Sequence, residues 1–99
     1  MDPLSIAASG MRAAELRMAT SAHNVANLRT PAFQRLDVQQ SAIEGGGVSA
    51  RVVRAETPEE PDLLREYLAQ FEPPLEFEAS ARVFEAAAEM SGTLVDLLA

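Results

Sequence analysis

The sequence predicts a mainly α-helical protein whose N- and C-terminal helices pair as an antiparallel, coiled-coil-like hairpin, with a small β-hairpin between them. Three observations predict it. Apolar residues recur at heptad spacing near both ends of the chain. The middle changes to short alternating runs around a glycine turn. Finally, 47% of the 99 residues are apolar but only 5% are aromatic, and much of the apolar fraction is alanine. Alanine favours helix but fills little core volume.

The first segment, residues 1–32, is predicted to be a helix followed by a turn. Asp2-Pro3 is a favourable start, because a capping carboxylate precedes proline at the first helical position. Four larger apolar residues follow at seven-residue spacing: Leu4, Met11, Met18 and Val25. Asn27 tolerates the conformation that ends a helix, and Pro31 keeps the residue before it out of the helical region.

Residues 33–55 are predicted to form the β-hairpin. Phe33–Val38 alternates weakly and Val48–Val52 more clearly, with the turn signal Ala42–Gly47 between them. Because two strands alone are marginally stable in water, we expect this hairpin to lie against another element.

The C-terminal region is predicted to be a polar, proline-punctuated linker at 56–63 and a helix at 64–99 kinked at Pro73-Pro74. Leu64, Leu68 and Phe71 form a short apolar stripe before the prolines. A longer stripe follows them, made of Phe77, Val83, Phe84, Ala87, Met90, Leu94 and Leu97.

The net charge of −7 is unevenly distributed. Residues 1–35 carry four arginines against two acids, a net +2, whereas residues 56–99 carry two arginines against eleven acids, a net −9. The acids either form a solvated face or attract the basic N-terminal helix, within or between subunits, and composition does not choose. An acidic chain disfavours free nucleic acid and anionic membranes as partners.

Nothing in the sequence indicates an enzyme, a cofactor or a metal site. The chain has no cysteine and one histidine, His23, which excludes disulfides, thiolate sites and multi-histidine centres. Gly45–Gly47 lacks the lysine and the following helix of a phosphate loop. His23 is better explained as an interface or capping side chain.

No basic run followed by an apolar block opens the sequence, so we expect no cleavable secretory signal. No apolar stretch approaches the roughly 18 residues that span a bilayer, so no membrane insertion is expected either. The default expectation is a cytoplasmic location, unless the chain leaves by a route that does not use such signals.

Two helices of this size leave part of each apolar stripe uncovered, which predicts packing against a partner or further copies of the chain. The predicted interface residues are Leu4, Met11, Met18, Val25, Phe77, Val83, Phe84, Met90, Leu94 and Leu97.

Both ends of the sequence resemble the flagellar basal-body rod and hook family. The N-terminal resemblance covers Ser5–Ala14 and Ser21–Phe33, and its closing motif places Asn24, Ala26, Asn27, Thr30, Pro31 and Phe33 in register with the family pattern. The C-terminal resemblance covers Phe77–Val83 and Glu89–Leu97. Gly45-Gly46-Gly47-Val48 further resembles the proximal rod branch.

The sequence also departs from that pattern. Ala32 stands where the family has glycine, which argues against a left-handed backbone there. Leu75 and Ser80 replace an arginine and an asparagine, Pro73-Pro74 interrupts a helical segment, and the middle is shorter. These differences indicate a short, divergent member.

The resemblance implies a structural axial subunit of the bacterial flagellar rod, assembling through its terminal helices with itself and with other basal-body proteins. It implies export by the flagellar type III apparatus and a periplasmic place in the basal body, with a role in motility. It also implies helix contacts between subunits, with Arg12 and Arg17 meeting acids such as Glu85 and Glu89. The alternative is a cytoplasmic helical adaptor or regulatory module that binds a partner helix.

Overall fold

The computed structural model describes residues 2–98, so Met1 and Ala99, the outer ends of the predicted terminal segments, lie outside the described residues. Its elements in chain order are α1 (Pro3–Ala26), β1 (Leu36–Ala42), β2 (Val48–Arg54), α2 (Leu63–Ala69) and α3 (Glu72–Leu98). The N-terminal helix contacts the C-terminal helical region, and a two-stranded antiparallel hairpin lies between them in sequence. The predicted mainly α fold is confirmed.

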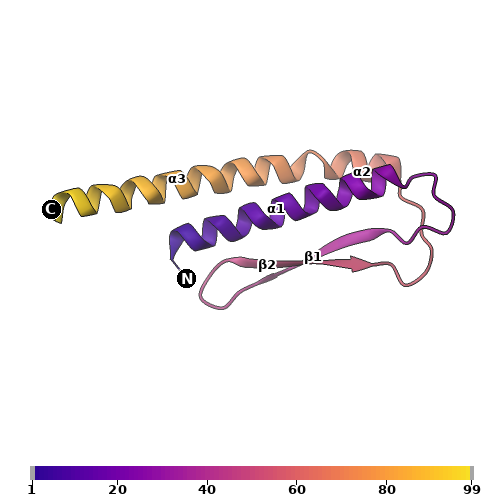
Figure 1. The fold of residues 1–99 in the computed structure, drawn as a ribbon, viewed down its shortest axis with the longest axis horizontal. Helices are drawn as coiled ribbons and strands as arrows, with labels where there is room; N and C mark the ends of the chain where they lie inside the picture. The colour runs from indigo at the N-terminus through magenta and orange to yellow at the C-terminus, as the bar shows by residue number, and fades with distance from the viewer. Residues whose placement is uncertain (1, 99) are drawn as a thin grey trace.

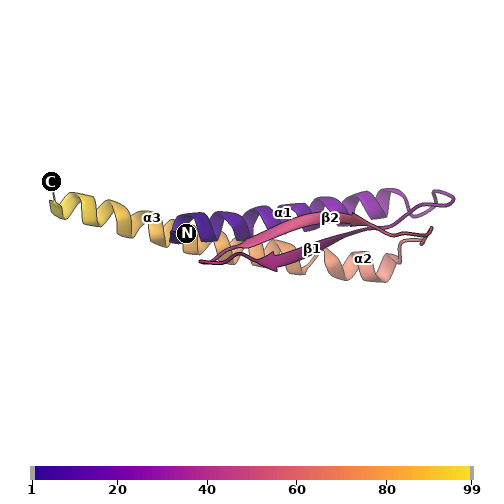
Figure 2. The same cartoon turned by 90° about the horizontal axis from the view of Figure 1, so that it is seen from below.

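Helix α1 is the middle layer of an elongated molecule (Figures 1 and 2). Helices α2 and α3 return antiparallel along one side of α1, and the hairpin lies along another side. The described molecule measures 62 × 24 × 14 Å with a radius of gyration of 17.4 Å, against about 13 Å for a compact chain of this length. The fold is therefore extended, with every other element packed against α1.

Capping residues fix both ends of α1 as the sequence predicts. At the start, the Asp2 carboxylate accepts a hydrogen bond from the backbone N–H of Ser5 at 2.8 Å. At the end, the Asn27 N–H donates to the Asn24 carbonyl, and the Thr30 hydroxyl donates to the Asn27 side chain at 3.0 Å. These bonds satisfy backbone groups that a helix end leaves without partners.

Ala32 adopts a left-handed backbone conformation with φ of 55°, so the prediction against it was wrong. The turn after Pro31 brings Phe33 back toward α1, where its ring lies 5.6 Å from that of His23. The tertiary position of Phe33 therefore decides the backbone at Ala32, at a cost of about 1–2 kcal/mol for a residue with a Cβ.

The first strand begins later and runs further than predicted. Phe33 and Gln34 pair with the linker instead, through a bond from the Glu59 N–H to the Phe33 carbonyl, while the Arg35 carbonyl accepts from the Ala55 N–H just beyond β2. The strands then pair from Leu36 with Arg54 to Ala42 with Val48. The closing loop contains Gly45, Gly46 and Gly47 at φ of 91°, 111° and 94°, a conformation that glycine adopts readily.

Two polar side chains of α1 hold the hairpin at both ends. The Ser9 hydroxyl accepts a hydrogen bond from the Val48 N–H at 3.0 Å. The Asn24 side chain bonds both backbone groups of Leu36, at 2.7 and 3.0 Å. The fifteen helical steps from Ser9 to Asn24 span about 22 Å, which matches a seven-residue strand. The hairpin thus lies against another element, as expected.

The C-terminal helical region breaks just before its two prolines. Helix α2 ends with Gln70 as its cap, and α3 begins at Glu72. Pro73 and Pro74 therefore lie inside the first turn of α3, whereas the sequence placed the restart after them. The first turn tolerates both prolines because its backbone N–H groups have no partners within the helix.

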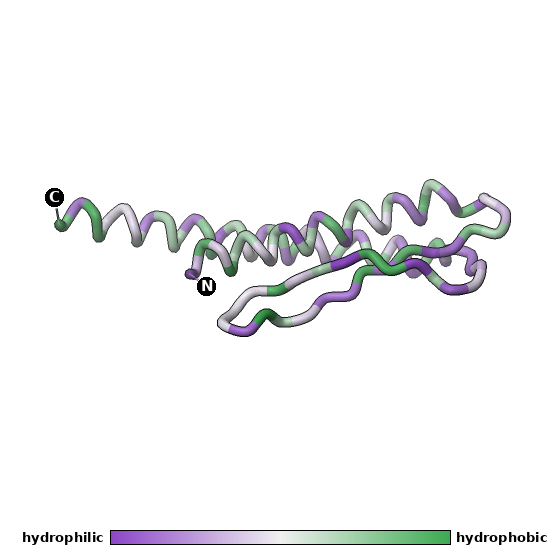
Figure 3. Tube along the Cα trace, turned by 60° about the horizontal axis from the view of Figure 1, so that its bottom comes forward, coloured by the Kyte–Doolittle hydropathy of each residue, from purple (hydrophilic) through white to green (hydrophobic). Residues whose placement is uncertain are grey.

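The interior is built from small and polar side chains. Among residues 2–98 the buried hydrophobic side chains are Ala7, Ala13 and Ala14. Larger apolar residues recur along α3 up to its C-terminal end (Figure 3), where they are exposed. The fold therefore leaves much of its apolar surface uncovered.

Candidate functional site

Helices α1 and α3 approach closely where their facing side chains are small. A Cβ added to Gly10 would lie 2.6 Å from the Ser80 hydroxyl. Ala7, Ala14 and Ser21, at heptad spacing on α1, are all buried. Small residues permit this close packing, and they contribute little hydrophobic burial to it.

One arginine joins the two helices electrostatically. Arg17 forms ion pairs with Glu76 and, at 3.5 Å, with Glu72. Burial raises the pKa of Glu76, and a hydrogen bond with Glu72 raises it further, while Arg17 opposes both effects. Within one chain, Arg17 therefore meets acids at the start of α3, not Glu85 or Glu89.

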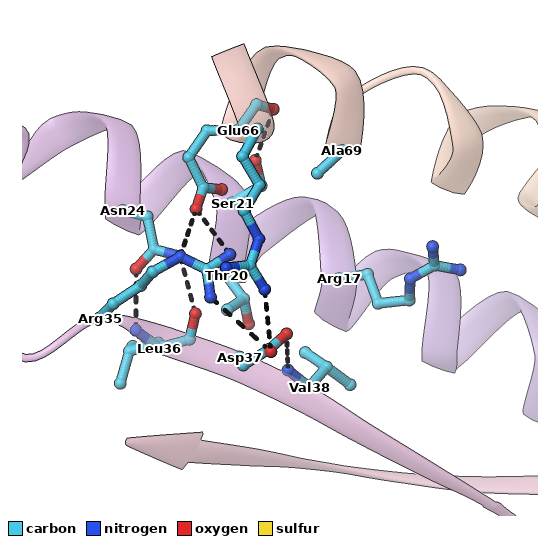
Figure 4. A pocket seen from close by; sticks show the side chains of 11 residues that line it. Arg17, Thr20, Ser21, Asn24, Arg35, Leu36, Asp37, Val38, Glu66 and Ala69 are labelled. Carbon is cyan, nitrogen blue, oxygen red and sulfur yellow. Dashed lines mark hydrogen bonds and ion pairs between the residues drawn. The ribbon is translucent and has the colours of Figure 1, made fainter. Parts of the chain in front are cut away.

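A buried polar cluster joins α1, the start of β1 and α2 (Figure 4). We call it the polar joint; it consists of Ser21, Asn24, Arg35 and Glu66. One Glu66 carboxylate oxygen accepts bonds from the Arg35 guanidinium at 2.9 and 3.0 Å and from the Asn24 amide at 3.1 Å. The Ser21 hydroxyl donates to the Glu66 carbonyl at 3.2 Å. Glu66 and Asn24 are each only 1% exposed.

The polar joint borders a cavity of about 150 Å³. Asp37 lies at its edge, 3.7 Å from both Arg35 and Arg65. Every buried side-chain nitrogen and oxygen in the described part of the chain has a hydrogen-bond partner. The arrangement holds three segments together and leaves no buried polar group free for a ligand.

Helix α3 extends well past the start of α1. Because Gly10 faces Ser80 and the helices are antiparallel, Pro3 lies level with Ala87. The remaining residues of α3, 88–98, form what we call the overhang, about 16 Å long at 1.5 Å per residue. Figure 1 shows this segment projecting beyond the N-terminus.

The overhang continues the side of α3 that α1 covers, but with larger residues. Pro3, Leu4, Ala87, Met90, Ser91 and Leu94 line a cavity of about 430 Å³ at its base. Met90, Leu94, Val95, Leu97 and Leu98 are 60–88% exposed. This is the largest concentration of exposed apolar side chains on α3, and it lies where α1 has ended.

The structure places the predicted interface residues on two surfaces. Leu4, Met11, Met18 and Val25 are half-buried along one edge of α1. Met18 follows Ser9 by nine residues, which is two and a half turns, so this edge faces away from the hairpin. On α3, Phe77 is half-buried, while Val83, Phe84, Met90, Leu94 and Leu97 are exposed.

The family-motif residues mainly turn the chain from α1 into β1. Asn24 belongs to the polar joint, Asn27 caps α1, Thr30 bonds Asn27 and Phe33 packs near His23. Ala26 and Pro31 are exposed. The motif therefore acts locally as a helix-to-strand connection.

Sequence reasoning missed Arg35 and Glu66. Glu66 is one of eleven acids in residues 56–99, and its neighbours gave no sign that its carboxylate is buried. The pairing joins residues 31 positions apart, so a single sequence carries no local signal for it.

Residues 2–98 show neither a metal site nor a membrane span. No group of three or more His, Cys, Asp or Glu side chains there is arranged to hold a metal ion. No described helix is long and apolar enough to cross a membrane. No known family model matches the chain, and no curated protein is significantly similar to it.

Proposed function

We propose that this chain is a structural axial subunit of the bacterial flagellar rod, a short and divergent one that assembles through its terminal helices. The proposal rests on two sequence motifs, one at each end of the chain, together with the arrangement of the two helices that carry them. Rod-type patterns occur at both ends of the sequence. The fold sets those two helices side by side and leaves the overhang without a partner in the described residues.

The exposed surface supports an assembly role. The chain exposes 6925 Å², whereas a compact monomer of 10.6 kDa exposes about 5500 Å². The excess lies on an elongated molecule whose large apolar side chains are exposed. Exposed apolar patches of this kind are typical of surfaces that other proteins cover.

In this proposal the partners are further copies of the chain and other rod proteins, and export follows the flagellar type III route to the periplasm. The test is cell fractionation with an antibody against the chain. Basal bodies purified from sheared, flagellated cells should contain the protein, and deleting its gene should impair motility. Detection in the cytosol alone would contradict the proposal and favour the adaptor alternative.

Self-association gives a second test with purified protein. Replacing Met18 and Met90 together with aspartate places charge on both apolar surfaces and should abolish self-association in sedimentation experiments. The matched control places aspartate at Gln39 and Gln40, which are exposed on β1, and should leave association unchanged. Circular dichroism on each variant separates lost association from lost folding.

A further inference from the structure

We infer that the outer edge of β2 binds an extended segment of another protein, which adds as a third, antiparallel strand and carries two acidic side chains. The site consists of the backbone groups of Ala50, Val52 and Arg54 and the side chains of Arg51 and Arg54. It lies on the hairpin and not on the helix surfaces of the proposed rod role, so either proposal can hold without the other.

The hydrogen bonds that flank the hairpin show which residues of β2 point outward. The Ala55 N–H donates to the Arg35 carbonyl at one end, and the Ile43 N–H donates to the Gly47 carbonyl at the other. Bonded and non-bonded pairs alternate along an antiparallel ladder, so in the register of this hairpin the bonded pairs fall on odd-numbered residues. Every even-numbered residue of the two strands therefore directs its N–H and C=O away from the other strand.

Helix α1 confirms this assignment and covers part of each outer edge. Both backbone groups of Leu36 in β1 bond to Asn24, and the N–H of Val48 in β2 donates to Ser9. These contacts lie at opposite ends of the hairpin, so α1 meets β1 at one end and β2 at the other. At the Asn24 end β1 therefore lies between α1 and β2, and the outer edge of β2 faces away from α1.

The outer edge of β2 is open from Ala50 to Arg54. Within residues 2–98 the backbone groups of Ala50, Val52 and Arg54 form no hydrogen bond to another segment or to a side chain. Val52 is 44% exposed and Arg54 is exposed. A row of unpaired donors and acceptors about 14 Å long is the template onto which an extended chain adds. Figures 1 and 2 show the hairpin on the outside of the molecule.

The outer edge of β1 is less open. Asn24 occupies both outward groups of Leu36, and the Asp37 carboxylate accepts a hydrogen bond from the outward N–H of Val38 at 2.9 Å. A side chain that bonds the edge of its own strand competes with an added strand. Strand addition is therefore favoured at β2.

Charge indicates which kind of segment fits the edge of β2. Arg51 and Arg54 are exposed, and neither forms an ion pair within residues 2–98, although the chain contains fifteen acidic residues. The Arg51 guanidinium donates to Gln39 on the neighbouring strand at 2.8 Å. Opposite charges on paired strands are stabilising and like charges are destabilising. An added strand should therefore place an acid opposite each arginine.

This chain contains no suitable strand of its own. β2 has two arginines and no acid, so two copies joined edge to edge at β2 would bring like charges together. The acidic linker 56–62 contains Pro58 and Pro61, and a proline has no N–H to donate to a ladder. The acidic segment is therefore expected from a different protein.

The register specifies the pattern of that segment. Opposite Arg54, Val53, Val52 and Arg51 in turn, an antiparallel strand should present an acid, two β-branched apolar residues and a second acid. The probe peptide acetyl-Thr-Glu-Val-Val-Glu-Thr-amide carries this pattern. Its matched control, acetyl-Thr-Lys-Val-Val-Lys-Thr-amide, keeps the strand-forming residues and reverses both charges.

Titration of the native chain with each peptide, followed by NMR, tests the site. The acidic peptide should shift the amide signals of Ala50, Val52 and Arg54 and slow their hydrogen exchange. Its Kd should be at least about tenfold lower than that of the lysine peptide. The double variant Arg51→Glu, Arg54→Glu should reverse the preference, which a purely structural role of the two arginines would not produce.

A second double variant controls for net charge. Arg12→Glu with Arg29→Glu makes the same charge change at two exposed arginines outside the hairpin. This variant should keep the preference for the acidic peptide. Circular dichroism confirms that each variant is folded.

Proline substitutions test whether the peptide binds as a strand. Val52→Pro removes an outward N–H that no group within residues 2–98 accepts, so the hairpin should stay folded while peptide affinity falls at least about tenfold. Gln40→Pro makes the matched change on the outer edge of β1 and should bind the peptide as the native chain does. Equal affinity of these two variants would show that the peptide does not pair with β2.

Three further results would overturn the inference. They are the absence of amide shifts at millimolar peptide, equal affinity for the acidic and lysine peptides, and an unchanged preference after reversal of Arg51 and Arg54. Edge amides whose protection in the free chain rises with protein concentration would show that a second copy covers β2, and would overturn it too. None of these results bears on whether basal bodies contain the protein, so the two proposals fail separately.

Discussion

The two ends of this molecule are built in opposite ways. At the end where α1, β1 and α2 meet, the buried groups are polar and charged: Ser21, Asn24, Arg35 and Glu66. At the other end, the overhang exposes Met90, Leu94, Leu97 and Leu98 to solvent. The chain thus uses hydrogen bonds to specify its own fold and leaves apolar area for contacts outside it.

The difference has a physical basis. A buried polar cluster is stable only when each member finds its partner, so it favours one arrangement of the segments that supply it. An apolar surface is less specific, because any close contact that excludes water from it is favourable. Substitutions along the chain probe this contrast, in order of decreasing expected effect.

The largest effect is expected from Glu66→Ala in the polar joint. The change leaves the Arg35 guanidinium and the Asn24 amide buried without their shared acceptor, which costs about 3–5 kcal/mol of unfolding free energy. Urea denaturation followed by circular dichroism measures it. The control Glu78→Ala breaks the exposed pair with Arg82 and should cost less than about 1 kcal/mol. Equal losses would remove the contrast between a buried and an exposed ion pair.

Gly46→Ala probes the packing of the hairpin tip on α1. Gly46 has φ of 111°, and an added Cβ would lie 2.7 Å from Ile6 Cδ1, so we expect a loss of about 1–3 kcal/mol. The same substitution at Gly92 in the overhang meets nothing within 4 Å and should stabilise α3 by up to about 1 kcal/mol. Thermal unfolding compares the two variants. A Tm shift of the same sign in both would contradict the assignment of a crowded site at Gly46 and an open one at Gly92.

Ala32→Gly is expected to stabilise the chain, because Ala32 has a left-handed φ of 55°. Relief of that strain outweighs the greater unfolded-state entropy of glycine, for a net gain of about 0.5–1 kcal/mol. Differential scanning calorimetry measures the rise in Tm. A lower Tm would show that the turn between α1 and β1 carries no strain at this residue.

The smallest effect is expected in the pH dependence of folding stability that titration of Glu76 causes. Burial raises its pKa above the ordinary value, so the protonated form is favoured in the folded state, and the associated stability is present at low pH and lost as pH rises through the raised pKa. Glu76→Gln removes this titration. The stability of the native chain relative to the variant should therefore fall between acidic and neutral pH, measured as Tm against pH.

Asp2 serves as the comparison, because its contribution to stability changes with pH in the opposite direction to that of Glu76. The Ser5 N–H bond lowers the pKa of Asp2, so its contribution is present above the unfolded pKa and lost as pH falls through the lowered one. Asp2→Asn keeps an acceptor for the cap without the titration. The native chain should lose stability relative to this variant as the pH falls below about 4. The same sign of change for Glu76→Gln and Asp2→Asn would contradict both assignments.

Sequence by itself determined the elements that depend on local chemistry. Asp2-Pro3 starts α1, Asn27 ends it, and the three glycines close the hairpin, because capping and positive φ are properties of a few neighbouring residues. Heptad spacing predicted the terminal helices and their pairing. The charge asymmetry left open whether the acids form a solvated face or attract the basic helix, and the ion pairs of Arg17 with Glu72 and Glu76 show attraction at the start of α3.

Tertiary structure alone decided which groups are buried together. Glu66 joins Arg35 and Asn24 across distant parts of the chain, Ala32 takes a conformation its own side chain disfavours, and Phe33 and Gln34 pair with the linker in place of β2. Each depends on contacts between segments far apart in sequence, and no local pattern encodes such contacts. The extent of the overhang also depends on tertiary structure. Heptad spacing predicted an apolar stripe on α3, but only the close packing of Gly10 on Ser80 fixed where α1 stops covering that stripe.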